Sequence, residues 1–337
     1  MFFNASNLVG DFSQWDVSNV TNMGEMFRDA AGFNSDLSSW DVSNVTNMGG
    51  MFRDAATFNS DLSSWDVSNV TTMNRMFSGA SSFNSDLNGW DVRSVTSMIG
   101  MFAGASSFNS DLSSWDVRDV TDMSTMFSNA SSFNSDLNNW DVSKVTKMSQ
   151  MFNNASAFAG DISSWDVSGV NNMDQLFRGA SSFDRDISGW DVSNVTNFNS
   201  MFRDASLFDQ DLGGWNMENA TSVSNMFRGA NISVDNYDNI LIGWASQNVA
   251  SGLSLGVVSS SFCNGEQARQ TLIDTKGWNI NDNGKRCPLP TDILSFTLPQ
   301  QTRKAKIDLN DFTVDITVLF GTDVTALQPT ITLSPGA

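Results

Sequence analysis

Apolar residues recur along most of this chain at an interval of 25 positions, with no insertion or deletion between them. Tryptophan stands at positions 15, 40, 65, 90, 115, 140, 165, 190 and 215, and phenylalanine keeps the same period from position 2 to position 227. An unbroken short period is typical of units that stack on their neighbours because none can bury its apolar side chains alone. The pattern predicts a solenoid of nine 25-residue repeats over residues 1–230, which begins in the middle of a repeat.

Each unit contains two spacings of apolar residues. Trp40 and Val42 flank the polar Asp41, which is the alternation of a β-strand with one buried face. The apolar residues of Met48–Ala55 recur at i, i+3, i+4 and i+7, as in an amphipathic helix, and Thr46 is a suitable N-cap. We therefore predict a short parallel strand plus a short helix in every unit.

Residues 231–288 lack the repeat and are predicted to cap the end of the stack. One helix is expected over Tyr237–Trp244, beginning near Ser233 or Asp235. A second helix is expected over Glu266–Lys276, with Asn264 as its cap.

The two cysteines, Cys263 and Cys287, bracket the second predicted helix. Two cysteines are too few for a zinc site but suit one disulfide. We predict that this bond locks the cap, which requires an oxidising compartment outside the cytosol. The alternative is a pair of reduced thiols.

Strand-like alternation marks the last part of the chain, after a linker at residues 289–291. The expected strands are Ile293–Leu298, Phe312–Val318 and Thr330–Leu333. Residues 292–337 resemble the start of an immunoglobulin-like β-sandwich module of Bacteroidetes surface proteins, but they are too few for a complete sandwich. We therefore expect further modules in the same polypeptide.

The chain is acidic and contains no histidine. It has 37 Asp and Glu against 18 Lys and Arg, a formal net charge of -19. Such a surface repels phosphate backbones, so nucleic acid is not an expected partner. Without histidine the commonest general base and transition-metal ligand is missing, and no Ser-His-Asp arrangement can form. No apolar run is long enough for a transmembrane segment.

Two aspartate columns follow the repeat, and no cofactor is required to explain them. Asp is a natural turn residue, so the first interpretation is that each carboxylate accepts backbone N–H groups in its own turn. The alternative is calcium, which prefers oxygen ligands. The column considered for calcium comprises Asp36, Asp61, Asp86, Asp111, Asp136, Asp161 and Asp186.

The second column follows each tryptophan and defines a candidate ligand-binding face. It comprises Asp41, Asp66, Asp91, Asp116, Asp141 and Asp166. Arg93 and Arg118 interrupt this acidic face and are the preferred candidates for a specific contact, with neutral surface variation as the alternative. The positions that vary between units include 28, 53, 78 and 103, and 43, 68, 93 and 118.

The motif W-D-V-S-x-V-T-x-M-x-x-M-F-x-x-A stands almost letter for letter in Trp40–Ala55, Trp65–Ala80 and Trp190–Ala205. It resembles the BspA-like leucine-rich-repeat bacterial surface proteins. The resemblance implies a leucine-rich-repeat-like solenoid, a place on the bacterial cell surface, a role in adhesion, and no catalytic residues.

These observations predict a non-enzymatic extracellular module that presents a rigid acidic face to a glycan, a matrix protein or a neighbouring cell. One alternative is a structural stalk that holds another domain away from the surface. Another is a secreted glycoside hydrolase, but a paired-carboxylate site would be expected to interrupt the repeat.

Overall fold

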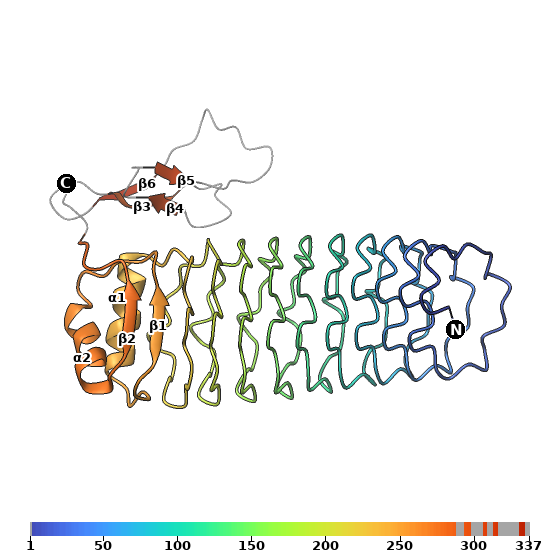
Figure 1. Ribbon diagram of the computed structural model, residues 1–337, viewed down its shortest axis with the longest axis horizontal. Coiled ribbons are helices and arrows are strands. Elements are labelled where there is room, and N and C mark those ends of the chain that lie inside the picture. The colour runs from blue at the N-terminus through green and yellow to red at the C-terminus, as the bar shows by residue number, and fades with distance from the viewer. Residues whose placement is uncertain (1, 288–292, 298–305, 309–312, 316–329, 334–337) are drawn as a thin grey trace.

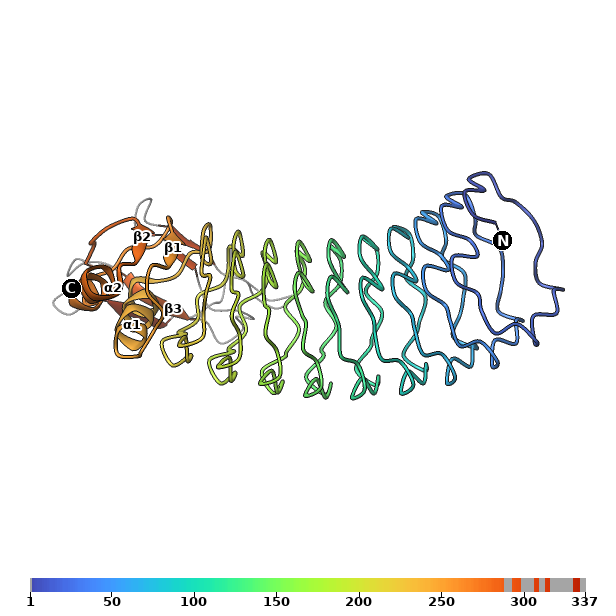
Figure 2. The same cartoon turned by 60° about the horizontal axis from the view of Figure 1, so that its bottom comes forward.

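The structure, a computed structural model, describes residues 2–287, 293–297, 306–308, 313–315 and 330–333. Figures 1 and 2 show that the repeated part of the chain winds in successive coils along one axis. Single parallel β-bridges join equivalent positions of adjacent coils, at Asn22, Asn47, Thr72, Ser97, Asp122, Lys147, Asn172, Asn197 and Ser222. The chain is therefore a repeat protein whose 25-residue units stack in register.

The helix predicted inside each unit is wrong, because residues 2–230 contain no α-helix. Consecutive turns replace it in Met48–Ala55. The N–H groups of Met51, Arg53 and Ala55 each reach back three residues, with N–O distances of 3.1 Å. The N–H groups between them bond to the next coil, as Phe52 does to Met76 O at 2.9 Å.

Left-handed residues explain why the helix does not form. Gly50 has a φ of 63° and Asp54 a φ of 58°, whereas every residue of an α-helix needs a negative φ. The same turns still bury Met48, Met51 and Phe52 completely. The helical spacing of apolar residues is thus satisfied by a different backbone.

The strand predicted around Trp40 is also wrong. Turns close there instead, with Trp40 N bonded to Leu37 O at 3.1 Å and Val45 N to Val42 O at 2.9 Å. Strand-like pairing falls later in the unit, at Asn47. Thr46 is not a helix cap, because its Oγ1 donates to Thr21 O in the preceding coil at 3.2 Å.

Aromatic columns form the core of the stack. From Trp40 to Trp190 the indole rings of adjacent coils lie nearly parallel, 6.3–6.5 Å apart. From Trp40 to Trp215 each Nε1 donates to a buried carbonyl 28 residues earlier, as Trp115 does to Leu87 O at 2.9 Å. Because buried indoles need a hydrogen-bond partner, these bonds fix each coil on its neighbour.

Both helices expected after the repeats are present. α1 spans Val234–Ala245, and the Ser233 side chain accepts from Asn236 N as its N-cap. α2 spans Glu266–Lys276 and ends at Gly277 in the left-handed conformation. The expected Asn264 cap is wrong, since Gly265 occupies the N-cap position and makes no side-chain bond.

A buried carboxylate holds the start of α2 instead. Asp238 of α1 accepts the N–H groups of Cys263, Asn264 and Gly265 at 2.6–2.9 Å. The predicted disulfide is confirmed, and it joins Cys263 to Cys287. The segment that leads into α2 is therefore held both to α1 and to Cys287.

The cap continues the stack rather than merely covering it. β1 (Ser254–Val257) pairs in parallel with β2 (Asn279–Asp282), and Phe227 N of the last repeat bonds to Gly256 O of β1 at 3.2 Å. The indole N–H groups of Trp244 and Trp278 donate to Leu212 O and Ala250 O. The tryptophan hydrogen bonds of the repeats therefore continue into the cap.

Among the described residues after the cap, four short strands occur. β3 (Ile293–Thr297) pairs antiparallel with β6 (Thr330–Leu333), and β4 (Lys306–Asp308) pairs antiparallel with β5 (Thr313–Asp315). β3, β5 and β6 lie within predicted strands, whereas β4 was not predicted. The linker at residues 289–291 and the remainder of the predicted strands lie outside the described residues. No helix in the described part of the chain is long and apolar enough to span a membrane.

Candidate binding face

One face of the stack is formed by the residues around the parallel bridges. Its side chains come from four positions in each unit, which in the second unit are Asn47, Gly49, Gly50 and Arg53. The backbone here is hydrogen-bonded to the coils on both sides. The side chains of Met48, Met51 and Phe52, which alternate with these positions, are buried in the core. We call these four columns the ladder face.

The ladder face varies between units whose cores are nearly identical. The column of Asn47 holds Asn22, Asn47, Thr72, Ser97, Asp122, Lys147, Asn172, Asn197 and Ser222. The column of Gly49 holds Gly24, Gly49, Asn74, Ile99, Ser124, Ser149, Asp174, Asn199 and Ser224. The column of Gly50 holds Glu25, Gly50, Arg75, Gly100, Thr125, Gln150, Gln175, Ser200 and Asn225. Stacking does not dictate these side chains.

The sequence prediction recognised only one of these columns, that of positions 28, 53, 78 and 103. The other three were not singled out, although those of Gly49 and Gly50 fall inside the predicted helix. A column-by-column comparison of the units would have revealed their variation. Only the structure, however, brings side chains from these columns together in one groove.

A groove of about 580 Å³ lies on the ladder face across the first four coils. Small residues form part of its lining, and polar or charged side chains surround them. The lining comprises Asn22, Gly24, Glu25, Asn47, Gly49, Gly50, Arg53, Thr72, Asn74, Arg75 and Ile99.

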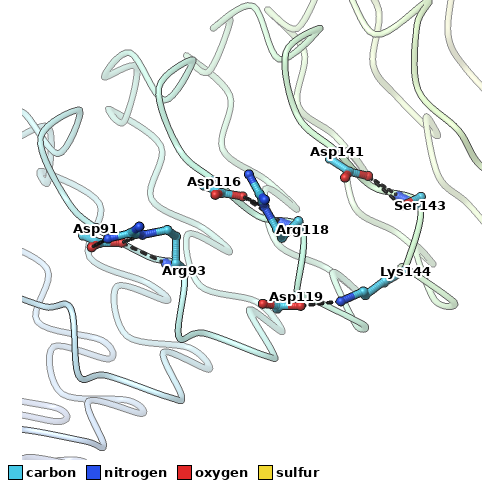
Figure 3. A network of polar contacts seen from close by, with 8 residues as sticks. All are labelled: Asp91, Arg93, Asp116, Arg118, Asp119, Asp141, Ser143 and Lys144. Atoms are coloured by element: carbon cyan, nitrogen blue, oxygen red, sulfur yellow. Dashed lines mark hydrogen bonds and ion pairs between the residues drawn. The ribbon is translucent and has the colours of Figure 1, made fainter.

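Arg93 and Arg118, the preferred contacts from the sequence, lie elsewhere, at the turn that follows each tryptophan (Figure 3). Arg93 pairs with Asp91 at 2.6 Å and Arg118 with Asp116 at 2.7 Å, both within their own coil. In each arginine the carboxylate hydrogen bond and charge raise the guanidinium pKa. Their side chains remain 68% and 62% exposed, so they form a charged edge open to solvent.

The second aspartate column lies along this same edge, where each carboxylate accepts the N–H of the residue two positions later. The accepting residues are Asp41, Asp66, Asp91, Asp116, Asp141 and Asp166, at 3.0–3.4 Å. Figure 3 shows the bond from Ser143 to Asp141 and the ion pair between Lys144 and Asp119 of adjacent coils.

The first column has the same turn geometry. Each carboxylate accepts the N–H of the residue two positions later at 2.9–3.0 Å. The accepting residues are Asp36, Asp61, Asp86, Asp111, Asp136, Asp161 and Asp186. In Asp61 and Asp111 the backbone bond is the main cause of a lowered pKa. No group of three acidic, cysteine or histidine side chains suited to a metal ion occurs among the described residues.

The stacked coils and their variable outer face define a repeat protein with a surface that differs from unit to unit. The family model described as "Mycoplasma protein of unknown function, DUF285" matches residues 1–88, 61–161 and 135–244, and the chain belongs to this family. The match agrees with the BspA-like resemblance of the motif. A second model, described as "SGBP, N-terminal", matches residues 293–337. No curated protein and no solved structure matches the chain.

Proposed function

We propose that this chain is a non-enzymatic binding module of a cell-surface protein, a leucine-rich-repeat-like solenoid that presents its ladder face to an extracellular glycan or protein. The observation that carries the proposal is the variation of the ladder face over a repeated core. Stacking keeps the buried columns nearly constant, whereas the ladder face differs from coil to coil and so offers a surface on which a specific site can form.

The extracellular location is supported by three features. The repeat family and the SGBP match both point to a surface protein, and the latter to one associated with glycan binding. The Cys263–Cys287 disulfide adds a chemical reason, because such bonds persist in oxidising compartments.

A rigid stack suits binding because its contacts are ordered before the ligand arrives. The backbone of each coil is hydrogen-bonded to both neighbours, and the aromatic columns are fully packed. A ligand therefore loses little affinity to ordering of the protein. The edge that carries Arg93 and Arg118 is a second possible contact surface of the same module.

The test is a screen of the full chain against immobilised glycans and matrix proteins. A matched variant would carry serine at the ladder-face positions of the first four coils: Asn22, Gly24, Glu25 and Arg28, and their equivalents. We expect binding by the natural chain and about tenfold or greater loss in this variant, since recognition is concentrated in few side chains.

A control variant would carry the same number of substitutions at the tryptophan-side turns, including Arg93 and Arg118. Loss of binding in the control alone would move the site to that edge. No binding by any chain would favour the stalk, and release of reducing sugar ends would favour a glycoside hydrolase.

A further inference from the structure

The groove across the first four coils exists because glycine stands where other coils carry larger residues. The backbone conformation does not require glycine at these positions. Gly50 has a φ of 63°, but Glu25, Arg75 and Thr125 adopt φ values of 57–58° at the same position of other coils. Glycine is therefore not required there. Likewise Gly49 stands where later coils carry Asn74 or Ile99. The absent side chains leave the groove open.

The polar groups of the groove are mainly donors. The Oδ1 atoms of Asn22 and Asn47 accept the N–H groups of Gly24 and Gly49 at 2.9 Å. The Oδ1 of Asn74 accepts from Ile99 N at 2.9 Å and from a serine hydroxyl. None of the three Nδ2 groups donates to a residue within the described ranges, so each offers two N–H donors.

The lack of a side chain at Gly24 leaves space for one of these donors, the Asn47 amide. A methyl group on Gly24 would lie 3.1 Å from Asn47 Nδ2, which is tighter than ordinary contact. A side chain at this position would therefore push the amide away. The glycine leaves room for the Asn47 amide on the groove side.

Arg75 is the charged residue of the groove that has no partner. Its guanidinium forms no hydrogen bond or ion pair with any residue that the structure describes, whereas Arg53 contacts Asp54 at 3.2 Å. Gly50 and Gly100 occupy its position in the coils on either side. The one carboxylate in the lining, Glu25, is bonded to Arg28 at 2.8 Å. The groove is thus rich in free donors within a chain of net charge -19.

We propose, as an extension of the function proposed above, that this groove binds a linear glycan bearing carboxylates, a polyuronate, along the axis of the stack. Carboxylates accept in-plane pairs of bonds from arginine, and the amide donors repeat from coil to coil as the acceptors of a polymer do. An extended peptide is less suitable, because the ladder backbone is already bonded between coils and cannot add a strand.

The same columns in later coils combine donors such as Lys147 with additional carboxylates. They include Asp122, which lies 3.5 Å from Lys147, and Asp174, whose carboxylate accepts from Asn199 at 2.8 Å. We therefore restrict the proposed site to the first four coils.

The experiment is isothermal titration of the full chain with oligomers of polygalacturonate, hyaluronan and alginate. Methyl-esterified polygalacturonate is the matched neutral probe, because it keeps the sugar backbone and removes the charge. We expect one or more of the acidic glycans to bind, with affinity that falls as salt concentration rises. The neutral probe should bind about tenfold or more weakly.

Two variants locate the site. Arg75→Gln removes the free charge, and Gly49→Asn fills the groove with a residue that the next coil carries at that position. Each should weaken acidic-glycan binding by about tenfold or more. The controls are Ser224→Asn, in the last repeat of the Gly49 column, and Arg228→Gln, in the last repeat of the Arg53 column, and these should leave affinity unchanged. Equal thermal midpoints would show that all variants fold.

The inference is overturned if the neutral probe binds as well as the acid form, or if Arg75→Gln has no effect, although glycan binding itself would then stand. Binding of poly-glutamate but of no polyuronate would also overturn it, because the ligand would be a peptide. If no glycan or protein binds at all, the proposed function fails as well.

Discussion

At the residue scale, the tryptophans do more than fill the core. Trp115 is 2% exposed, and its Nε1 donates to the buried Leu87 carbonyl at 2.9 Å. Its ring also packs on Trp90 and Trp140. Trp15 in the first coil is 40% exposed, and its Nε1 bonds to no residue of the described chain. Tryptophan at the same position of two different repeats should therefore contribute very differently to the free energy of unfolding.

We predict that Trp115→Phe lowers the free energy of unfolding by about 1–3 kcal/mol, because it shrinks a buried ring and leaves the Leu87 carbonyl with the Trp90 N–H as its one donor within the described chain. Trp15→Phe, the matched control, should cost less than about 1 kcal/mol. Denaturant unfolding followed by circular dichroism would measure both. Equal effects would contradict the role given to the indole bond.

At the element scale, hydrogen bonds in several of the turns beside the tryptophans favour the ionised form of aspartate. Asp41 has a lowered pKa because the Ser43 hydroxyl and N–H donate to it, and Asp61 because Ser63 does so. A carboxyl whose pKa is lower in the folded chain stabilises the fold above its unfolded pKa. That contribution is lost as pH falls through the folded value.

We therefore expect the thermal midpoint to fall as pH decreases below about 3.8, the ordinary aspartate value from which these pKa values are lowered. A variant with asparagine at Asp41, Asp61 and Asp111 should lose part of this dependence. Asparagine can form the same turn uncharged, as Asn216 does with Glu218 N at 3.0 Å. Identical pH profiles for the two chains would argue against the turns as the cause. Calorimetric scans between pH 7 and pH 2 would decide.

The cap helices could be predicted from the sequence, whereas the turns of the repeats could not. The cap helices follow from local signals, Ser233 at the start of α1 and Gly277 at the end of α2. The repeat turns do not, because residues such as Thr125 and Gln150 are left-handed without being glycine. Hydrogen bonds to coils 25 residues away hold them there, and no local rule contains those bonds.

At the scale of the whole molecule, the two ends of the stack differ. The first coil exposes Phe3 by 55% and Val9 by 89%. At the other end, Trp244 packs against Phe227, and Tyr237, Arg269 and Asp282 form a buried hydrogen-bonded group. Burial and the Asp282 carboxylate strongly raise the Tyr237 pKa, so this hydroxyl stays protonated as a donor. The cap thus covers the apolar end of the last coil.

Reduction of Cys263–Cys287 should loosen this end first. The bond closes a loop with a sequence separation of 24, for which chain entropy gives about 3–4 kcal/mol. Hydrogen exchange should rise in residues 231–287 on reduction, while the central coils stay protected because each contacts only its neighbours. The Cys263→Ser, Cys287→Ser double variant is the control and should behave like the reduced chain. Uniform loss of protection along the stack would show that the cap and coils unfold as one unit.

The sequence by itself determined the period, the buried columns, the two cap helices and the disulfide, because each depends on residue type at a fixed spacing. Tertiary structure decided how the backbone of a unit runs, since the spacing of Met48, Met51, Phe52 and Ala55 fits a helix and a series of turns equally well. Bonds between coils select the turns. The same bonds gather distant variable positions into the ladder face. They also place Arg75 between Gly50 and Gly100 of the adjacent coils, which are distant in the sequence.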